Sequence, residues 1–322
     1  MLVLKAAIIL AHLMVVCLMI LPIAWQKLTF WWLDNLINLQ LQWSILALLL
    51  ILLSLKYLQQ LVIPFSLLYL VVITYNFAPF YKIEGHKEKS KEILNIAQLN
   101  IQYGNPGIDD LVVELGQSNY DVILLQEVGD NEHEKINKLI DYYPYSAGAG
   151  YLENYPSGMA LFSRWPLVAR KTHNLGYVGG NIIEVIIQSP ENAIPIHLFA
   201  LHPGAPRNKT LWQLRNSTLD YVAQQVSASR LPYKIVIGDI NTSPWSPAFK
   251  SLENTGVLQN SARGFGYIPS WAPGSTNKLI RWIISAYIDH CLVSSSFKII
   301  NKEYKTINGS DHVLIATVLG FE

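Results

Sequence analysis

The chain has 322 residues, of which 51% are hydrophobic and 15% are charged, whereas about 25% is the usual charged share of a soluble domain. The deficit lies in residues 1–81, whose charged side chains are Lys5, Lys27, Lys56 and Asp34. The remaining residues include 21 basic and 22 acidic side chains and have an ordinary globular composition. The composition therefore excludes a disordered chain and a simple soluble enzyme.

The near-neutral charge of the second part limits its partners. Proteins that hold duplex nucleic acid through its phosphates usually carry a marked basic excess, so no dedicated duplex DNA-binding surface is expected. Cys17 lies in an apolar run and Cys291 in a strand-like run, which excludes a disulfide framework. The sequence gives no indication of an oligomeric state.

Three apolar segments near the N-terminus are each about as long as a membrane-crossing helix, which needs ~20 residues. They cover residues 6–25, 36–55 and 61–80. A tight turn is expected near Lys56, because one continuous helix would be far longer than a bilayer is thick. A cleaved signal peptide is the alternative for the first segment, but no small-residue cleavage site follows Pro22. We therefore predict a transmembrane region over residues 1–81 of a multi-pass cell-membrane protein.

The second segment is the weakest, because Asn38, Gln40 and Gln42 lie near its start. If these amides face the neighbouring helices, three spans result; if they draw the segment to the interface, only two form. We favour three. His12 is read as a polar contact within the bundle rather than as a proton relay. The lysines between residues 82 and 91 favour a cytoplasmic location of the globular domain, but the side stays open.

After a charged linker at residues 82–92, strand-like and helix-like segments alternate over residues 93–322. Helices are expected after Asn105-Pro106, near residues 131–140 and over the amphipathic segment 208–226. The strand-like runs are residues 93–101, 120–125, 158–162, 182–187, 194–201, 233–237, 280–293 and 313–319. This mixture predicts an α/β or α+β domain in which helices cover sheets.

Polar residues recur in or beside six of these strands. A single Asp or Asn at a strand end is more often a turn residue than a functional one, but six clusters together indicate a site. They are Asn100, Glu127, His202, Asp239 with Asn241, Asp289 with His290, and Asp311 with His312.

The ordered set of motifs around these residues resembles the endonuclease/exonuclease/phosphatase superfamily. The motifs are Leu99-Asn100, Leu125-Gln-Glu127, Ser157-Gly-Met-Ala-Leu-Phe-Ser-Arg164, His202-Pro, Ile237-Gly-Asp-Ile-Asn241, Ile288-Asp-His and Gly309-Ser-Asp-His312. The group with several N-terminal membrane spans and Ser243-Pro-Trp-Ser-Pro after the Gly-Asp-x-Asn motif is the most similar. The resemblance implies a four-layer sandwich of two mixed β-sheets flanked by helices.

The resemblance also implies a metal site. Glu127, with Asn100 nearby, offers the oxygen ligands that Mg²⁺ or Mn²⁺ prefers. Asp311 is expected either to be a second metal ligand or to hold its loop. Zinc is rejected, because neither cysteine has a partner at ligand spacing and the eight histidines form no H-E-x-x-H pattern.

The remaining roles follow from the same resemblance. His312 resembles the catalytic histidine that acts with the water nucleophile, and Asp289 resembles the carboxylate that orients it. Asp239 and Asn241 resemble the pair that positions the nucleophile and binds the phosphate; either Asp239 or His312 takes the proton. His202 is expected to donate to a phosphate oxygen. His290 is expected to be a packing residue.

Three further residues bear on the substrate side. Arg164 is expected either to reach the substrate phosphate or to anchor a strand end. Trp271 belongs to the substrate-side loop, where Ser270 and an inserted Ala272 depart from the family's commoner Thr-Trp-Pro pattern. Arg215 is expected to be solvated on the polar side of its helix.

These observations predict a membrane-anchored, Mg²⁺-dependent hydrolase that cleaves a phosphodiester, in nucleic acid or in a phospholipid headgroup. The lack of a basic surplus and the tether to a bilayer favour a lipid or small phosphoester. The alternatives are a phosphomonoesterase on inositol or other small phosphates, and an inactive membrane scaffold with the same fold.

Overall fold

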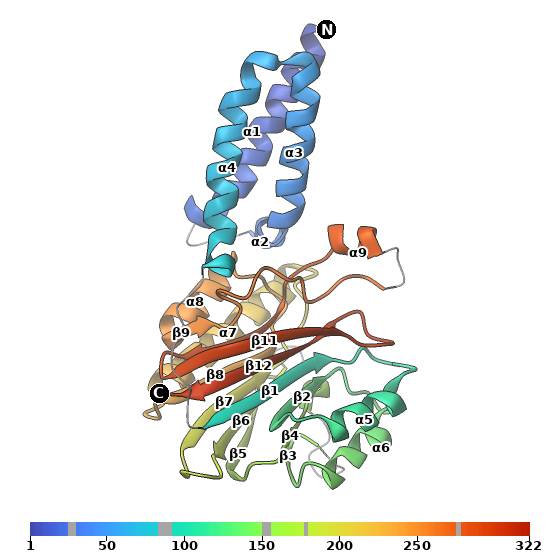
Figure 1. Ribbon diagram of the computed structural model, residues 1–322, viewed down its shortest axis with the longest axis vertical. Coiled ribbons are helices and arrows are strands. Elements are labelled where there is room, and N and C mark those ends of the chain that lie inside the picture. Colours follow the sequence, from blue (N-terminus) through green and yellow to red (C-terminus); the bar gives the residue numbers. More distant parts are fainter. Residues whose placement is uncertain (25–29, 83–91, 150–155, 177–179, 275–277) are drawn as a thin grey trace.

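The computed structural model describes residues 1–24, 30–82, 92–149, 156–176, 180–274 and 278–322. Residues 83–91, most of the predicted linker, lie outside the described residues. A bundle of long helices stands at one end of the molecule, and the packed sheets of the catalytic domain form the other (Figure 1).

Among the described residues, three helices are long and apolar enough to cross a membrane: α1 (Leu2–Ala24), α3 (Gln40–Tyr57) and α4 (Gln59–Tyr81). Leu58 alone separates α3 from α4, so the turn falls where the sequence requires one. His12 of α1 holds the bundle together, because its ring nitrogens lie 2.8 Å from the hydroxyls of Ser54 on α3 and Tyr69 on α4. This histidine is a polar contact within the bundle, as expected.

The second apolar segment begins as a helix later than the sequence predicts. Residues 31–37 form a separate short helix, α2 (Trp31–Ile37), and α3 starts only at Gln40. The polar side chains at this corner have partners that explain the break: Asp34 pairs with Arg215, and Asn38 accepts hydrogen bonds from Ser243. The start of the predicted second span, residues 36–39, therefore belongs to the junction with the catalytic domain.

The catalytic domain contains two six-stranded mixed sheets. The first has the order β11 (Phe297–Thr306), β12 (Val313–Phe321), β1 (Ile93–Asn100), β2 (Val122–Gln126), β4 (Ala160–Ser163) and β3 (Tyr145–Ala147). The second has the order β5 (Leu167–Asn174), β6 (Asn181–Gln188), β7 (Pro195–Leu201), β8 (Tyr233–Asp239), β10 (Asp289–Ser294) and β9 (Leu258–Asn260). The pairs β1–β2 and β7–β8 are parallel, whereas the other pairs are antiparallel.

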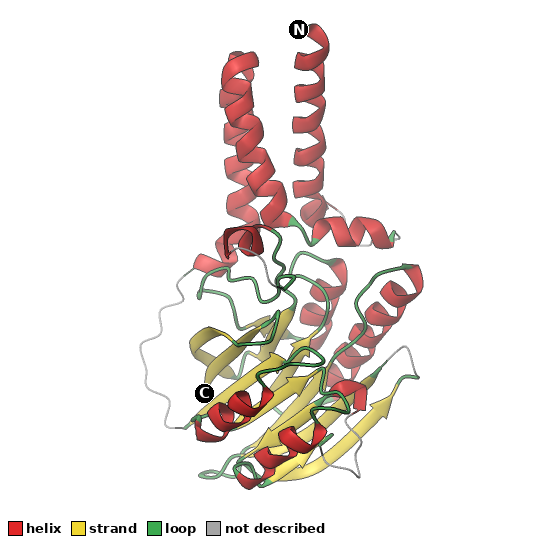
Figure 2. Ribbon diagram, turned by 90° about the vertical axis from the view of Figure 1, so that its right-hand side faces the viewer, coloured by secondary structure: helices red, strands yellow, loops and turns green. Residues whose placement is uncertain are grey.

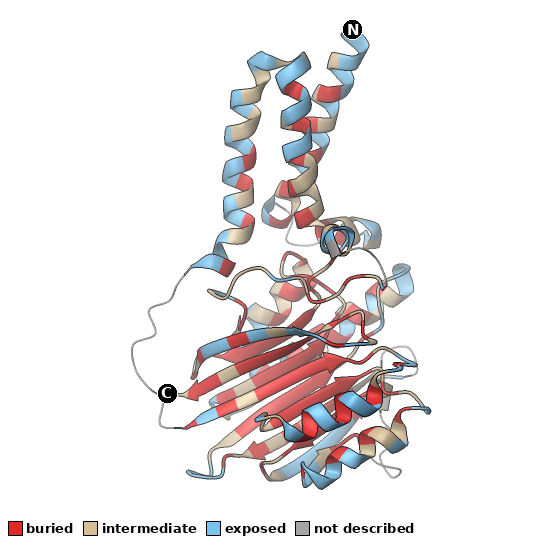
Figure 3. Cartoon of the chain, turned by 45° about the vertical axis from the view of Figure 1, so that its right-hand side comes forward, coloured by how far each residue is buried: buried red, intermediate tan, exposed pale blue. Residues whose placement is uncertain are grey.

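Alternation along the strands explains why the sheets stack. Successive side chains of a strand point to opposite faces. In β1, Leu94 and Ile96 join the apolar core between the two sheets, while Ala97 and Leu99 join the core beneath the helices. Burial of both faces matches the nearly continuous apolar runs in the sequence, and Figure 3 shows the strands buried between helices that expose their outer faces.

Helices complete the four layers (Figure 2). Helices α5 (Ile108–Gln117) and α6 (His133–Asn137), followed by a 3-10 turn (Lys138–Asp141), cover the first sheet. Helices α7 (Lys209–Ala228) and α8 (Pro247–Gly256) cover the second. Asn208 caps α7 by accepting a hydrogen bond from the Leu211 amide at 2.9 Å, which explains why the helix begins there. The predicted four-layer fold is confirmed.

The run at residues 280–293 is not the single strand that the sequence predicts. Its first part forms the end of a short helix, α9 (Lys278–Ile283), and only Asp289–Ser294 forms strand β10. The apolar residues of α9 are exposed instead of paired in a sheet: Leu279 is 66% exposed, Ile280 51% and Trp282 50%. Strands β5 and β11 were not predicted either, because their outward residues interrupt the apolar pattern.

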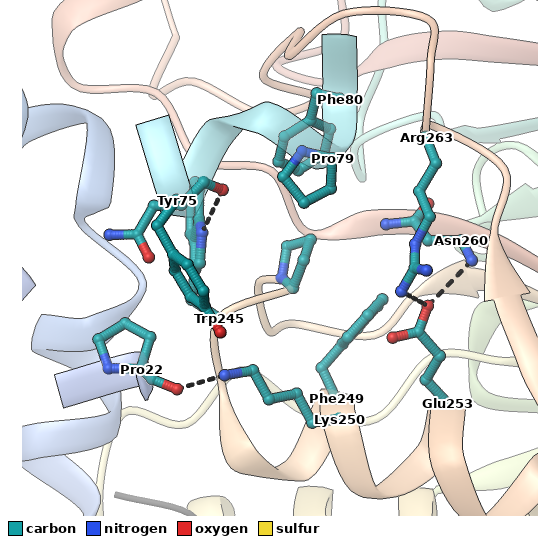
Figure 4. A pocket seen from close by; sticks show the side chains of 12 residues that line it. Pro22, Tyr75, Pro79, Phe80, Trp245, Phe249, Lys250, Glu253, Asn260 and Arg263 are labelled. Atoms are coloured by element: carbon teal, nitrogen blue, oxygen red, sulfur yellow. Dashed lines mark hydrogen bonds and ion pairs between the residues drawn. The ribbon is translucent and has the colours of Figure 1, made fainter. Parts of the chain in front are cut away.

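The helix bundle packs directly on the catalytic domain. Ile37 and Phe80 share an apolar cluster with Trp245 and Tyr287 of the catalytic domain. The Trp245 indole also donates to the Asn76 carbonyl at 3.1 Å. Beside this contact lies a cavity of about 340 Å³, lined by side chains of both parts (Figure 4). The bundle is therefore a packed part of the structure.

Candidate active site

Gln126, at the end of β2, joins the two sheets next to the predicted site. Its side-chain amide donates to the Leu201 carbonyl at 3.2 Å, and its side-chain oxygen accepts from the Asp239 amide at 3.1 Å. Glycine at position 238 allows Leu201 and Gln126 to lie this close to the β8 backbone, since a Cβ there would lie 2.0 Å from the Leu201 carbonyl oxygen. Gln126 lies within a motif of the sequence, but the motif alone indicates no role for it.

Glu127 follows β2 in a left-handed backbone conformation, with φ of 58°. Such strain in a non-glycine residue is concentrated at functional sites. One Glu127 oxygen accepts from the Asn100 side-chain amide at 2.9 Å, and the other accepts from the Tyr103 backbone amide at 3.3 Å. The Asn100 side-chain oxygen accepts a hydrogen bond from the Gln102 backbone amide at 3.1 Å. In this arrangement the Asn100 side-chain amide orients Glu127.

Asp239 ends β8 and is buried beside a second carboxylate. Its Oδ1 accepts from the Asn241 amide at 2.9 Å, and its Oδ2 lies 3.3 Å from the Asn100 side-chain nitrogen. Burial, followed by the negative charge of Asp289, raises the pKa of Asp239 to about 6. A carboxylate with this pKa is suited to accept a proton near neutral pH.

His312 and Asp289 form a hydrogen-bonded pair, with 2.8 Å between the histidine Nδ1 and the carboxylate Oδ2. Ser270 accepts from the Asp289 amide, and Ser310 accepts from the His312 amide, each at 3.0 Å. Burial disfavours the imidazolium, but Asp289 and then Asp239 outweigh it and raise the pKa of His312 to about 9. His312 is therefore positively charged at neutral pH.

The predicted site residues converge around Asp239. The His202 Nε2 lies 3.9 Å from both Glu127 Oε1 and Asp239 Oδ2. The His312 Nε2 lies 3.8 Å from both Asp239 Oδ2 and Asp311 Oδ1. These separations exceed direct hydrogen-bond lengths, so one small ligand atom can contact several of the groups together.

Asp311 and Trp271 hold the substrate-side loop. The Trp271 indole donates to Asp311 Oδ2 at 2.8 Å, and the amide of the inserted Ala272 donates to the Asp311 carbonyl at 3.0 Å. The inserted residue thus binds the loop to the segment just before β12 instead of disrupting it. Trp271, Asp311, Arg281 and Trp282 also line a cavity of about 410 Å³ next to His312.

Arg164 and Arg215 both have structural roles. Arg164 donates to the carbonyls of Gly116 and Ser118 and lies over the Tyr143 ring. Ser163 pairs with Val122 at the start of β2, which places Arg164 at the end of the strand remote from Glu127. Arg164 therefore anchors the strand end and does not reach the site.

The prediction of a solvated Arg215 is wrong. Its side chain is buried, because α2 covers this face of α7 and places Asp34 against the guanidinium. His290 is a packing residue, as expected. Its ring lies between those of Phe249 and Tyr287, and burial lowers its pKa to about 4.

The sequence of the chain matches a known protein family. The model of the Endonuclease/Exonuclease/phosphatase family matches residues 97–312. The chain belongs to this family. It is therefore a metal-dependent hydrolase that acts on phosphate ester bonds. No curated protein sequence matches the chain.

Solved structures share the fold at low sequence identity. An endonuclease/exonuclease/phosphatase from Bacteroides vulgatus is 15% identical with a TM-score of 0.56, and the match covers 72% of this chain and 100% of that one. TDP2 from D. rerio, complexed with a single-stranded DNA product, has the same identity and TM-score, covering 71% and 100%. Sphingomyelinase C from Streptomyces griseocarneus is 15% identical with a TM-score of 0.51, covering 72% and 100%.

The donor groups of the site fit a divalent cation. Ligand atoms of Asp239, Asp289 and His312 lie within 4.8 Å of one another, which makes these residues a candidate metal group. However, the direct bond between His312 and Asp289 uses one ligand atom of each. Glu127 is 25% exposed and faces the same centre with a hard oxygen donor. Glu127 therefore adds an oxygen donor next to this candidate group.

Proposed function

We propose that the protein is a membrane-anchored phosphodiesterase that uses Mg²⁺ or Mn²⁺ and takes its substrate at the bilayer surface. The observation that carries this proposal is the convergence of Asp239, the His312–Asp289 pair and Glu127 in the domain that packs against the membrane bundle. A scaffold without activity would not need two buried carboxylates held near an imidazole at the cost of burying charge.

Each residue of the site has a chemical role in this proposal. A cation held by Glu127, with Asp311 as a second candidate ligand, would neutralise charge on the phosphoryl oxygens. Asp239 accepts the proton of the attacking water, since the raised pKa still leaves it ionised at neutral pH. As the water oxygen binds to phosphorus, the bond from phosphorus to the leaving oxygen breaks, and the leaving oxygen takes a proton from solvent. His312, as an imidazolium oriented by Asp289, donates from Nε2 to the phosphoryl group.

His202 and Asn241 complete the phosphate side. The His202 Nδ1 lies 3.4 Å from the Ser157 carbonyl, which leaves Nε2 facing the centre as a donor or acceptor. Asn241 donates one side-chain hydrogen bond to the Pro203 carbonyl at 3.0 Å, so its amide retains one proton for a substrate oxygen. Trp271 borders the adjoining cavity, where the substrate's organic group would lie.

A surface next to the site favours a lipid-borne substrate. Gln42, in the first turn of α3, donates to the carbonyls of Ile283 and Ser285 at 2.9 and 2.8 Å. This contact places α9 at the end of a candidate span, where Figure 1 shows it beside the base of the bundle. Its exposed side chains, Leu279, Ile280 and Trp282, suit the interfacial zone of a bilayer.

The substrate test compares defined phosphate esters in Mg²⁺. Purified full-length protein is incubated with phospholipid vesicles, single-stranded DNA, inositol phosphates and a soluble aryl phosphodiester, beside a Glu127→Gln control. We expect hydrolysis of phospholipid and of the soluble diester. Release of phosphate from monoesters alone would favour the phosphomonoesterase, and hydrolysis of DNA alone would favour a nuclease.

A second arm tests the α9 surface. Replacing Leu279 and Trp282 together by serine should lower turnover on vesicles about tenfold and leave turnover on the soluble diester unchanged, because only the bilayer substrate needs the apolar surface. Equal loss on both substrates would contradict an interfacial role for α9.

We also propose that all three long helices cross the membrane, which puts Met1 and Glu322 on opposite sides. The amides of Gln40 and Asn76 bind to each other at 3.0 Å, which supports the reading in which polar groups face neighbouring helices. Reporter fusions at the two ends measure their locations in intact cells. If both reporters label the same compartment, the three-span arrangement is wrong.

A further inference from the structure

A buried arginine connects the membrane region to the catalytic loop. Arg215 of α7 is 1% exposed, and each of its guanidinium nitrogens has a partner. Two of these partners matter here: Asp34 of α2, whose Oδ2 lies 2.5 Å away, and the backbone carbonyl of Asn241 at 2.8 Å. Asp34 also accepts from the Trp212 indole at 2.9 Å. A carboxylate from the membrane region thus supplies the counter-charge for an arginine that binds the catalytic loop.

The bound carbonyl belongs to a residue that orients Asp239. Asn241 has a φ of 52°, in the left-handed region, which asparagine adopts more readily than most other non-glycine residues. In this conformation its amide donates to Asp239 Oδ1 at 2.9 Å. The other oxygen, Oδ2, is then the atom that faces His202 and His312.

A second contact from the membrane region reaches the same loop. The Asn38 side-chain oxygen accepts from the Ser243 hydroxyl at 2.7 Å and from the Ser243 amide at 3.2 Å. Ser243 is itself buried and lies two residues after Asn241. The loop is therefore held from the membrane side at both positions, through Arg215 and through Asn38.

We propose that Asp34 and Asn38 of the membrane region are positioning residues of the active site. They hold residues 239–243 in their conformation and thereby orient the Asp239 carboxylate. This inference rests on the proposed function of Asp239. The bundle then completes the catalytic site as well as anchoring it, and the catalytic loop is correctly set only while α2 is docked on α7.

The test must separate positioning from folding. Replacing one partner of a buried ion pair leaves the other charge unpaired, which is destabilising, whereas replacing both by apolar residues is often tolerated. Asp34→Leu should therefore lower both the melting temperature and kcat. The double variant Asp34→Leu/Arg215→Met should regain the melting temperature, but it has no donor for the Asn241 carbonyl. Its kcat on the soluble phosphodiester should stay about 10- to 100-fold low, with KM within about twofold of the original.

Asn38→Ala provides a second variant in case the double variant does not fold, and a smaller loss of kcat is expected from it. Lys250→Met is the matched control, since Lys250 also links the catalytic domain to the bundle through the Pro22 carbonyl (Figure 4) but lies outside residues 239–243. This control should keep its kcat. Recovery of full kcat in the double variant together with full kcat in Asn38→Ala would overturn the proposal.

Hydrogen exchange gives a readout that does not depend on hydrolysis. The amides of residues 240–243 should exchange faster in the double variant and in Asn38→Ala than in the wild type or in Lys250→Met. Faster exchange in a protein that hydrolyses no phosphodiester would uphold the positioning role while refuting the proposed function. Unchanged exchange in both variants would overturn the positioning role whatever the activity.

Discussion

In the apolar helix bundle, several buried polar side chains hydrogen-bond to one another. His12 binds Ser54 and Tyr69, and Asn76 binds Gln40. At the catalytic centre, by contrast, the carboxylate of Asp239 is buried near that of Asp289, and the facing nitrogens of His202 and His312 lie beyond hydrogen-bond distance. Both regions bury polar groups, but only one keeps like charges close together and groups available for a ligand. That difference distinguishes a structural polar cluster from a reactive one.

The largest effect is expected when the imidazole of the catalytic centre is removed. His312→Ala should lower turnover by a factor of ~10² to 10⁴, because the imidazolium donor and its charge are both lost. Asp289→Asn should cost less, since packing also orients His312. Steady-state kinetics on a soluble phosphodiester measure both effects.

If the two residues act as one unit, the double variant should be no slower than His312→Ala alone. Strictly multiplicative losses would show that they act separately. The melting temperature of each variant is the control, because Asp289 is buried and its replacement also affects folding.

The pH dependence of turnover is the second test. Asp239 must be ionised to accept a proton, and the pKa of about 6 predicts that turnover rises as the pH increases through this value. His312 must be protonated to donate, and the pKa of about 9 predicts a decline above that value. The expected profile of kcat against pH is a bell, whose limbs report the coupled groups.

In His312→Ala the alkaline limb should disappear, while the acidic limb should remain. An alkaline limb that persists in this variant would show that His312 is not the group responsible for it.

The smallest effect is expected in the bundle. His12→Leu removes hydrogen bonds to Ser54 and Tyr69, and such bonds between membrane helices average about 0.6 kcal/mol each. We therefore expect a loss of about 1 kcal/mol in the free energy of unfolding of the bundle, with kcat unchanged. Unfolding in detergent measures the first quantity, and Leu10→Ala, at a position that is 66% exposed, is the control. A large fall in kcat would contradict a purely structural histidine.

The sequence was informative where composition or an ordered motif carries the signal. The sequence alone locates the long apolar segments and the residues near strand ends, Asn100, Glu127, Asp239 and His312. Alternation and apolar runs depend on local burial, and a family motif preserves spacing along the chain, so both are readable from one sequence.

The features that were missed depend on contacts between distant segments. Arg215 has the spacing of a solvated residue, and only the docking of α2 buries it. Gln126 acquires its role from the approach of Gly238 in the other sheet. The apolar run that includes α9 has the pattern of a buried strand, and periodicity alone does not distinguish a strand from a short exposed helix. The helix is held in place by Gln42, which is distant in sequence.

The central claim is that Glu127 holds a divalent cation on which the hydrolysis of a phosphodiester depends. The most direct measurement is turnover on a soluble phosphodiester by wild-type protein and Glu127→Gln, each across a titration of Mg²⁺ and in excess chelator. We predict that the wild type loses its activity in chelator and regains it with Mg²⁺, and that Glu127→Gln remains folded but inactive at every Mg²⁺ concentration. Full activity of the wild type in chelator, or of Glu127→Gln at ordinary Mg²⁺ concentrations, would contradict this account.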